Sequence, residues 1–78
     1  MLNVQPGNKL KRNQTLGPDS TDVAFDLIRG ATFQVLRVNK GVNIDVEVVD
    51  SQSSYPAIGS KMGIPEKYLE SRYFSVLR

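Results

Sequence analysis

The chain contains no cysteine, no histidine and no tryptophan among its 78 residues. Without cysteine it forms neither disulfides nor thiolate metal sites, and without histidine it lacks the commonest general base and metal ligand. No apolar run approaches the roughly 20 residues of a membrane-spanning helix, and the N-terminal MLNVQPGNKLKRN has no signal-peptide-like apolar stretch. We therefore expect a soluble, cytoplasmic protein that is not an enzyme and holds neither cofactor nor metal.

What the chain does contain is typical of one globular domain. Hydrophobic residues make up 40% of it and charged residues 23%, a balance that favours a packed core over disorder. We expect a single domain over residues 1–78, with its core in 8–77 and residues 1–7 loose. Residues 1–40 carry six basic and three acidic side chains, against four and five in the remainder. This weakly basic first half is compatible with an anionic partner but does not require one.

The clearest periodic signal runs from Val42 to Val48, where β-branched apolar residues alternate with polar ones. Such alternation predicts a strand with one wet face. Residues 31–38 are also rich in β-formers, and their alternation breaks at Leu36, which indicates a bulge or burial on both faces. Asn39-Lys40-Gly41 between the two segments predicts a tight turn and therefore a hairpin. We expect its inward side chains to pack together in the core: Val42, Ile44, Val46 and Val48, with Phe33, Val35 and Phe74.

The remaining segments predict three more strands and a single 3₁₀ turn. Residues 8–12 favour a short edge strand, residues 57–64 a glycine-rich strand, and residues 73–77 a closing strand. Residues 22–28, in the long connection 13–29, favour one or two helical turns, and residues 65–69 a 3₁₀ turn that begins at a proline. Gly30 and Gly63 each lie where a turn meets a strand, so at least one should need a positive φ or a close backbone approach. The fold class is thus all-β, a small five-stranded barrel with one 3₁₀ turn before the last strand.

Three segments in this order resemble Src-homology-3-type barrels: LIRGATFQVLRV (27–38), the strand 42–49, and GIPEKYL (63–69). The last is similar to the family's Gly-x-x-Pro-x-x-Tyr-hydrophobic segment. The resemblance implies that Gly63 ends a strand, Pro65 begins the turn, and Tyr68 and Leu69 pin it to the barrel. In signalling members, the matching proline and tyrosine help to bind proline-rich peptides, a recognition that needs a groove walled by aromatic rings.

The frame Pro-Gly-x-Lys-hydrophobic-Lys-Arg (6–12) followed by Ile-Pro-Glu-Lys-Tyr-Leu (64–69) also resembles small accessory proteins of tailed bacteriophages. Many of those are single barrels of unknown role, and some bind host proteins. This resemblance implies a phage-encoded protein that acts in the cytoplasm of a host bacterium.

A protein-binding patch is predicted around the 3₁₀ turn. It comprises Tyr55, Tyr68, Tyr73, Met62 and Pro65, with Ile58 beside them. Tyrosine is favoured at interfaces because it joins a rigid apolar ring to a polar tip. The alternative is that these residues cover the open end of the barrel. On this basis we expect a non-catalytic module that binds another protein.

A second hypothesis is a nucleic-acid-binding barrel. Lys9, Lys11 and Arg12 could contact phosphates, with Tyr55 or Tyr73 as a stacking platform; the alternative is an edge strand protected by its lysines. Asn43, Asp45 and Glu47 share one strand face and could bind a hard cation, but alternation alone places polar residues on a solvated face. We therefore expect no metal site there.

Overall fold

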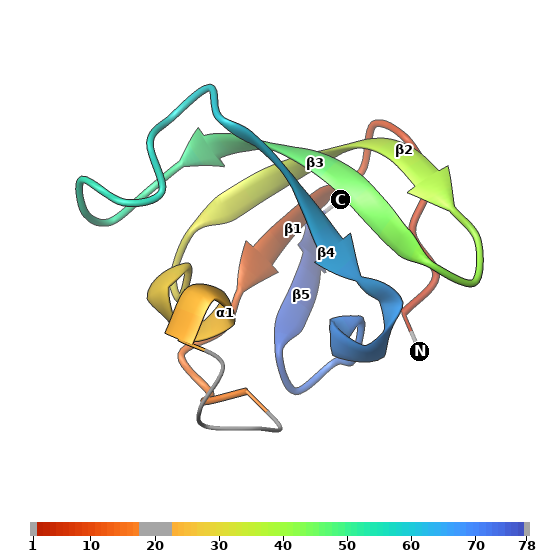
Figure 1. The fold of residues 1–78 in the computed structure, drawn as a ribbon, viewed down its shortest axis with the longest axis horizontal. Coiled ribbons are helices and arrows are strands. Elements are labelled where there is room, and N and C mark those ends of the chain that lie inside the picture. The colour runs from red at the N-terminus through yellow and green to blue at the C-terminus, as the bar shows by residue number, and fades with distance from the viewer. Residues whose placement is uncertain (1, 18–22, 78) are drawn as a thin grey trace.

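The computed structural model describes residues 2–17 and 23–77 (Figure 1). Its elements are β1 (Lys9–Arg12), α1 (Val23–Leu27), β2 (Thr32–Asn39), β3 (Asn43–Asp50), β4 (Lys61–Pro65), the 3₁₀ turn η1 (Glu66–Tyr68) and β5 (Phe74–Leu77). The all-β class, the five strands and the 3₁₀ turn before the last strand are confirmed. The short helix falls within the predicted segment 22–28.

All strand pairs are antiparallel and belong to one sheet with the order β4-β3-β2-β1-β5. In Figure 1, β2 and β3 arch above β1 and β5, so the sheet bends around a shared interior. Within the described strands β4 and β5 are not hydrogen-bonded to each other, so the sheet is not closed.

The β2–β3 hairpin follows the predicted alternation closely. Gly41 takes a φ of +83° in the turn, a conformation that glycine adopts without steric cost. The strand register shifts between Val35 and Arg37, which confirms a bulge at Leu36. One residue was wrongly assigned to the core: Val42 is 67% exposed because it lies in the turn, one residue before β3 begins.

The prediction that the first strand forms an edge is wrong. β1 lies between β2 and β5, with Lys9 opposite both Gln34 and Leu77. Its burial alternates, so that Lys9 and Lys11 are exposed while Leu10 and Arg12 are buried. The lysines therefore face solvent on the outer side of the sheet and protect no strand edge. The described edges are β4 and β5.

The core is a single cluster that draws on both hairpin strands, β1, α1 and the C-terminal elements. It comprises Leu10, Phe25, Ile28, Ala31, Phe33, Val35, Ile44, Val46, Val48, Ile64, Tyr68, Leu69, Tyr73 and Phe74. Leu2 and Val4 pack against it, and the Leu2 amide donates to the Leu69 carbonyl at 2.8 Å. The described part of the N-terminal segment is therefore attached to the core, unlike the loose terminus expected from the sequence.

Gly30 meets the expectation that one of two glycines needs a special backbone. Its φ is +83°, whereas Gly63 does not have a positive φ. A Cβ on Gly30 would also lie 2.7 Å from Gln52 Cδ and 2.8 Å from Gln14 Nε2. Both are ends of exposed side chains, joined only by a 3.3 Å hydrogen bond, so they can move aside.

We expect Gly30→Ala to lower the free energy of unfolding by about 1–2 kcal/mol, the cost of a left-handed conformation for a residue with a Cβ. Gly41→Ala is the matched control, because Gly41 has the same φ and no atom within 4 Å of an added Cβ. The two losses should agree within about 0.5 kcal/mol in urea denaturation if the glutamines yield freely. A Gly30→Ala variant as stable as the parent protein would contradict the positive φ at Gly30.

Candidate functional site

An apolar groove of about 290 Å³ opens between α1 and the segment formed by β4 and η1. It is lined by Ala24, Phe25, Ile28, Tyr55, Met62, Gly63, Ile64, Pro65 and Tyr68. Four of the five residues predicted to bind a partner are among these: Tyr55, Met62, Pro65 and Tyr68. The groove is therefore the feature of the structure that corresponds best to the predicted patch.

The wall and floor of the groove follow from local sequence. Phe25 of α1 and Ile28, one residue after α1 ends, are buried in the core, while Ala24 is exposed at the rim. On the other side Pro65 precedes η1, whose last residue, Tyr68, is buried. The Phe25 and Tyr68 rings stack with centroids 3.9 Å apart and an interplanar angle of 14°. This stack joins α1 to η1 across the base of the groove.

Tyr73 is the one residue of the predicted patch that lies elsewhere. It is only 3% exposed and meets Phe25 edge-on, with centroids 5.7 Å apart. Its ring belongs to the core cluster, where this contact with Phe25 is made. Tyr55, by contrast, is 50% exposed at the groove. The three tyrosines therefore divide into a rim residue, a base residue and a core residue.

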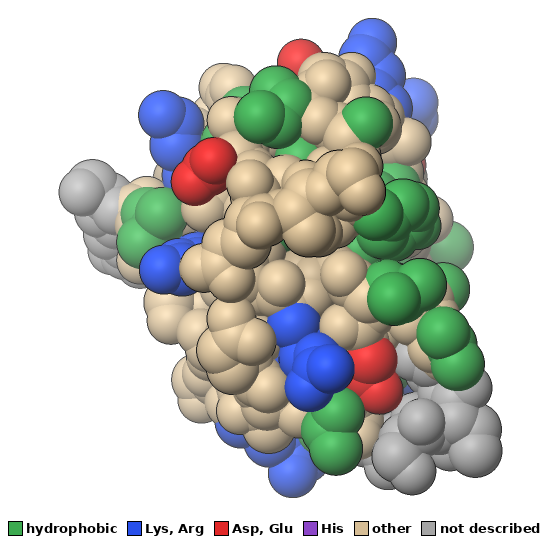
Figure 2. Space-filling model, turned by 90° about the vertical axis from the view of Figure 1, so that its left-hand side faces the viewer, with side chains coloured by type: hydrophobic (Ala, Val, Ile, Leu, Met, Phe, Trp, Pro, Cys, Tyr) green, Lys and Arg blue, Asp and Glu red, His purple; other side chains and the backbone are tan. Residues whose placement is uncertain are grey.

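The groove is lined and bordered by apolar and uncharged side chains. None of the described residues that line it carries a charge. Large apolar side chains that are more than half exposed lie on α1 and in the connection between β3 and β4: Val23, Leu27 and Ile58. Figure 2 faces the side that carries both elements and shows hydrophobic side chains gathered along one flank of it. The apolar surface thus extends beyond the groove itself.

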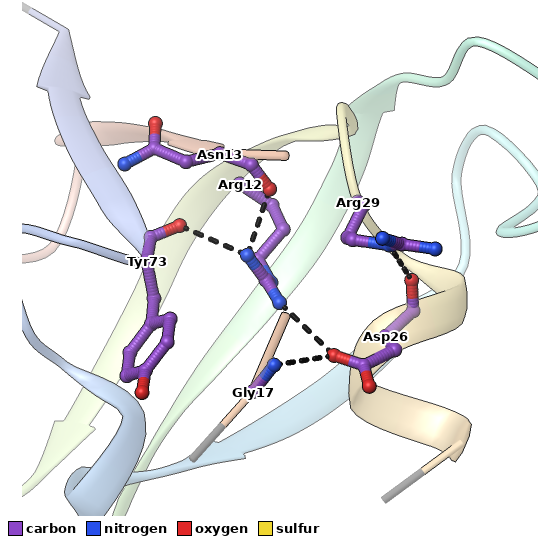
Figure 3. Close-up of polar contacts among 6 residues, drawn as sticks. All are labelled: Arg12, Asn13, Gly17, Asp26, Arg29 and Tyr73. Atoms are coloured by element: carbon purple, nitrogen blue, oxygen red, sulfur yellow. Dashed lines mark hydrogen bonds and ion pairs between the residues drawn. The ribbon is translucent and has the colours of Figure 1, made fainter. Parts of the chain in front are cut away.

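Arg12 lies inside the protein, with its guanidinium between Tyr73 and Asp26 of α1 (Figure 3). Its side chain is 0% exposed, so it is not accessible to a phosphate. Nη1 donates to the carbonyls of Asn13 at 2.7 Å and Tyr73 at 3.4 Å, and Nη2 pairs with Asp26 Oδ1 at 3.4 Å. Its guanidinium carbon lies 4.0 Å from the centroid of the Phe25 ring.

This environment acts on Arg12 in two opposing ways. Burial lowers the pKa of its guanidinium, and the neighbouring Asp26 carboxylate offsets only part of this lowering. Nε has no hydrogen-bond partner among the described residues. A buried donor without a partner costs about 1–3 kcal/mol, so the aromatic and ionic contacts of Arg12 have to offset that cost. The sequence did contain a signal for this burial, because Leu10 and Arg12 occupy alternate positions of one strand.

The two remaining residues of the predicted phosphate site, Lys9 and Lys11, are exposed on β1. In register across the sheet, Lys9 lies opposite Gln34, Gln34 opposite Glu47, and Glu47 opposite Lys61. The outer face of the sheet is therefore of mixed charge. Such a face attracts a phosphate backbone only weakly.

Asn43 and Asp45 both accept a hydrogen bond from the side chain of Asn39. Asn39 Nδ2 donates to Asn43 Oδ1 at 2.8 Å and to Asp45 Oδ2 at 3.2 Å. Across residues 2–17 and 23–77, no group of three or more acidic side chains is placed to hold a metal ion. Over the same residues no helix is long and apolar enough to cross a membrane.

Comparison with known proteins identifies no relative, since no protein-family model, no curated protein and no solved structure matches the chain.

Proposed function

We propose that the protein is a non-catalytic binding module that takes up apolar side chains of another protein in the groove between α1 and β4–η1. The observation that carries this proposal is the uncharged lining of a groove of about 290 Å³ that includes Tyr55, Met62 and Tyr68. Aromatic and methionine side chains are enriched in protein interfaces, where anchors fill desolvated pockets. The groove lies at the lower end of the roughly 300–1,000 Å³ range of small-molecule sites. Its exposed apolar margin favours a partner with a larger contact surface.

The strand order supports a Src-homology-3-type arrangement within this proposal. β1 lies between β2 and β5, and η1 precedes the last strand, as in the family that the sequence resembles. The resemblance to phage accessory proteins leads us to place the partner among the proteins of a bacterial host's cytoplasm. Fold alone says little about function, so the groove and not the sheet carries the proposal.

We expect Tyr55→Ala to weaken partner binding by roughly tenfold or more, because an aromatic anchor at an interface typically contributes at least about 1.4–2 kcal/mol. The fold should not change, since half of the Tyr55 side chain is exposed. The measurement compares proteins retained from a bacterial lysate by the parent chain and by the variant, followed by dissociation kinetics with the retained protein. Val42→Ala is the matched control, an exposed apolar residue that is outside the groove.

Equal retention by all three chains would contradict the proposal.

Nucleic-acid binding is the second candidate function, favoured by the exposure of Lys9 and Lys11 on β1. This function predicts that the chain retains nucleic acid from the lysate, that nuclease treatment abolishes this retention, and that replacing both lysines with alanine reduces it. Since Arg12 is buried, two phosphate contacts remain, and the log–log salt dependence would have a slope of only about −1.4 to −1.8.

A further inference from the structure

We propose that Arg12 is a positioning residue for the groove, holding α1 in place from behind so that its exposed side forms the groove wall. This inference rests on the proposed function only in calling the groove a binding site. Arg12 itself lines none of the groove. It acts through Phe25 and Asp26, two consecutive residues of α1.

The Phe25 ring lies between Arg12 and Tyr68. The Arg12 guanidinium carbon is 4.0 Å from its centroid, and the Tyr68 ring is stacked on it at 3.9 Å. One face of a benzene ring has room for only one such neighbour at this distance, so the two must occupy opposite faces. The order guanidinium, Phe25, Tyr68 therefore runs from the protein interior to the base of the groove.

Asp26 supplies the second attachment. Its Oδ1 pairs with Arg12 Nη2 at 3.4 Å and accepts a hydrogen bond from the Gly17 amide at 2.7 Å (Figure 3). One carboxylate oxygen thus ties α1 both to β1 and to Gly17 in the segment that follows β1. A charge-assisted contact of this kind is stronger than one between neutral groups.

α1 needs such attachments because it is short. It has five residues, Val23–Leu27, and isolated helices of fewer than about 12 residues are marginal in water. Its orientation is therefore set by tertiary contacts. Arg12 is well suited to provide them, since β1 is hydrogen-bonded on both sides and the carbonyls of Asn13 and Tyr73 fix Nη1.

The guanidinium group also has the required shape. It is planar, stacks on aromatic faces and offers several donors in fixed directions, whereas a lysine ammonium is a flexible point charge. Lysine at position 12 would keep the charge beside Asp26 but lose the flat contact with Phe25. Arg12→Lys is therefore the variant that separates positioning from simple charge balance.

The experiment is NMR on the full chain, with indole as an apolar probe for the groove. In Arg12→Lys we expect the cross-relaxation between the Phe25 and Tyr68 rings to fall at least threefold. The dissociation constant of indole, followed at the Ala24 and Met62 methyl groups, should rise at least fivefold. Val35→Ala is the control, because Val35 is buried in the core but does not line the groove. It should lower global stability and leave both readouts within twofold of the parent chain.

Asp26→Asn is the second variant, for the case that Arg12→Lys does not fold. Asparagine keeps an oxygen for the Gly17 amide and removes the charge, so both readouts should change in the same direction by about twofold or more. The inference is overturned if a folded Arg12→Lys, or failing that Asp26→Asn, matches Val35→Ala in both readouts. If indole does not bind the parent chain, the groove as a binding site is in error, and the ring cross-relaxation alone decides the role of Arg12.

Discussion

Val46→Asp is expected to leave the protein largely unfolded. Val46 is 0% exposed near the middle of β3, opposite Val35 on one side and Met62 on the other. The substitution would bury a carboxylate in the apolar core cluster, at a cost of several kcal/mol. A chain of this length has a total stability of only about 4–12 kcal/mol. Circular dichroism during urea denaturation would show a transition shifted to much lower urea or absent.

The matched control is Val42→Asp, the same change four residues earlier in the hairpin. Val42 is 67% exposed in the turn, so a carboxylate there stays hydrated and stability should change by no more than about 0.5 kcal/mol. A Val46→Asp variant that unfolds together with the parent chain would mean that the β3 register is wrong. A large loss in Val42→Asp would place the start of the inward face at Val42, two residues before Ile44.

The hairpin could be predicted because its information is local. Alternation of β-branched and polar residues from Ile44 to Val48 fixes which side chains face inward, and Gly41 marks the turn. The proline-initiated turn at 65–68 is local in the same way. Val42 was misplaced because alternation continues one step beyond the residue at which pairing begins, and periodicity alone does not show where a ladder stops.

The position of β1 in the sheet could not be predicted, because it depends on contacts between distant residues. Lys9 pairs with Leu77 and Arg12 with Phe74, across more than sixty residues of chain. A local pattern of lysines was equally compatible with a protected edge and with the outer face of an interior strand. The choice between them is made by the C-terminal strand, which the pattern at residues 8–12 does not contain.

The sequence predicted which kinds of residue form the candidate site, but only in part where each of them lies in the structure. Tyrosine, methionine and proline near a 3₁₀ turn indicated an apolar surface, and four of those five residues do line the groove. Nothing in the sequence separated Tyr55 at the rim from Tyr73 in the core. The α1 wall was missed because Ala24 and Phe25 lie forty residues or so before β4, in a connection with no clear partner.

Arg12→Met is expected to cause the second large loss, about 3 kcal/mol of unfolding free energy. Removing one member of a buried ion pair typically costs about 3–5 kcal/mol, because the other charge is left without a partner. The Asp26 side chain retains 12% exposure, so water solvates part of its charge and the lower end applies. Methionine fills much of the same space and removes the unpaired Nε donor, which also keeps the loss at this lower end. Denaturation in urea measures it.

The double variant Arg12→Met, Asp26→Asn tests whether the loss comes from the stranded carboxylate. With Asp26 neutral, no buried charge is left unpaired, and the asparagine oxygen can still accept from the Gly17 amide, a contact of 2.7 Å in the parent chain. We therefore expect the double variant to be more stable than Arg12→Met by about 1 kcal/mol or more, although Asp26→Asn alone is destabilising. Coupling of this sign and of about 0.5–3 kcal/mol is typical of residues in direct contact. Strictly additive losses would show instead that the stability provided by Arg12 comes from its stacking on Phe25 and its bonds to the two carbonyls, independently of Asp26.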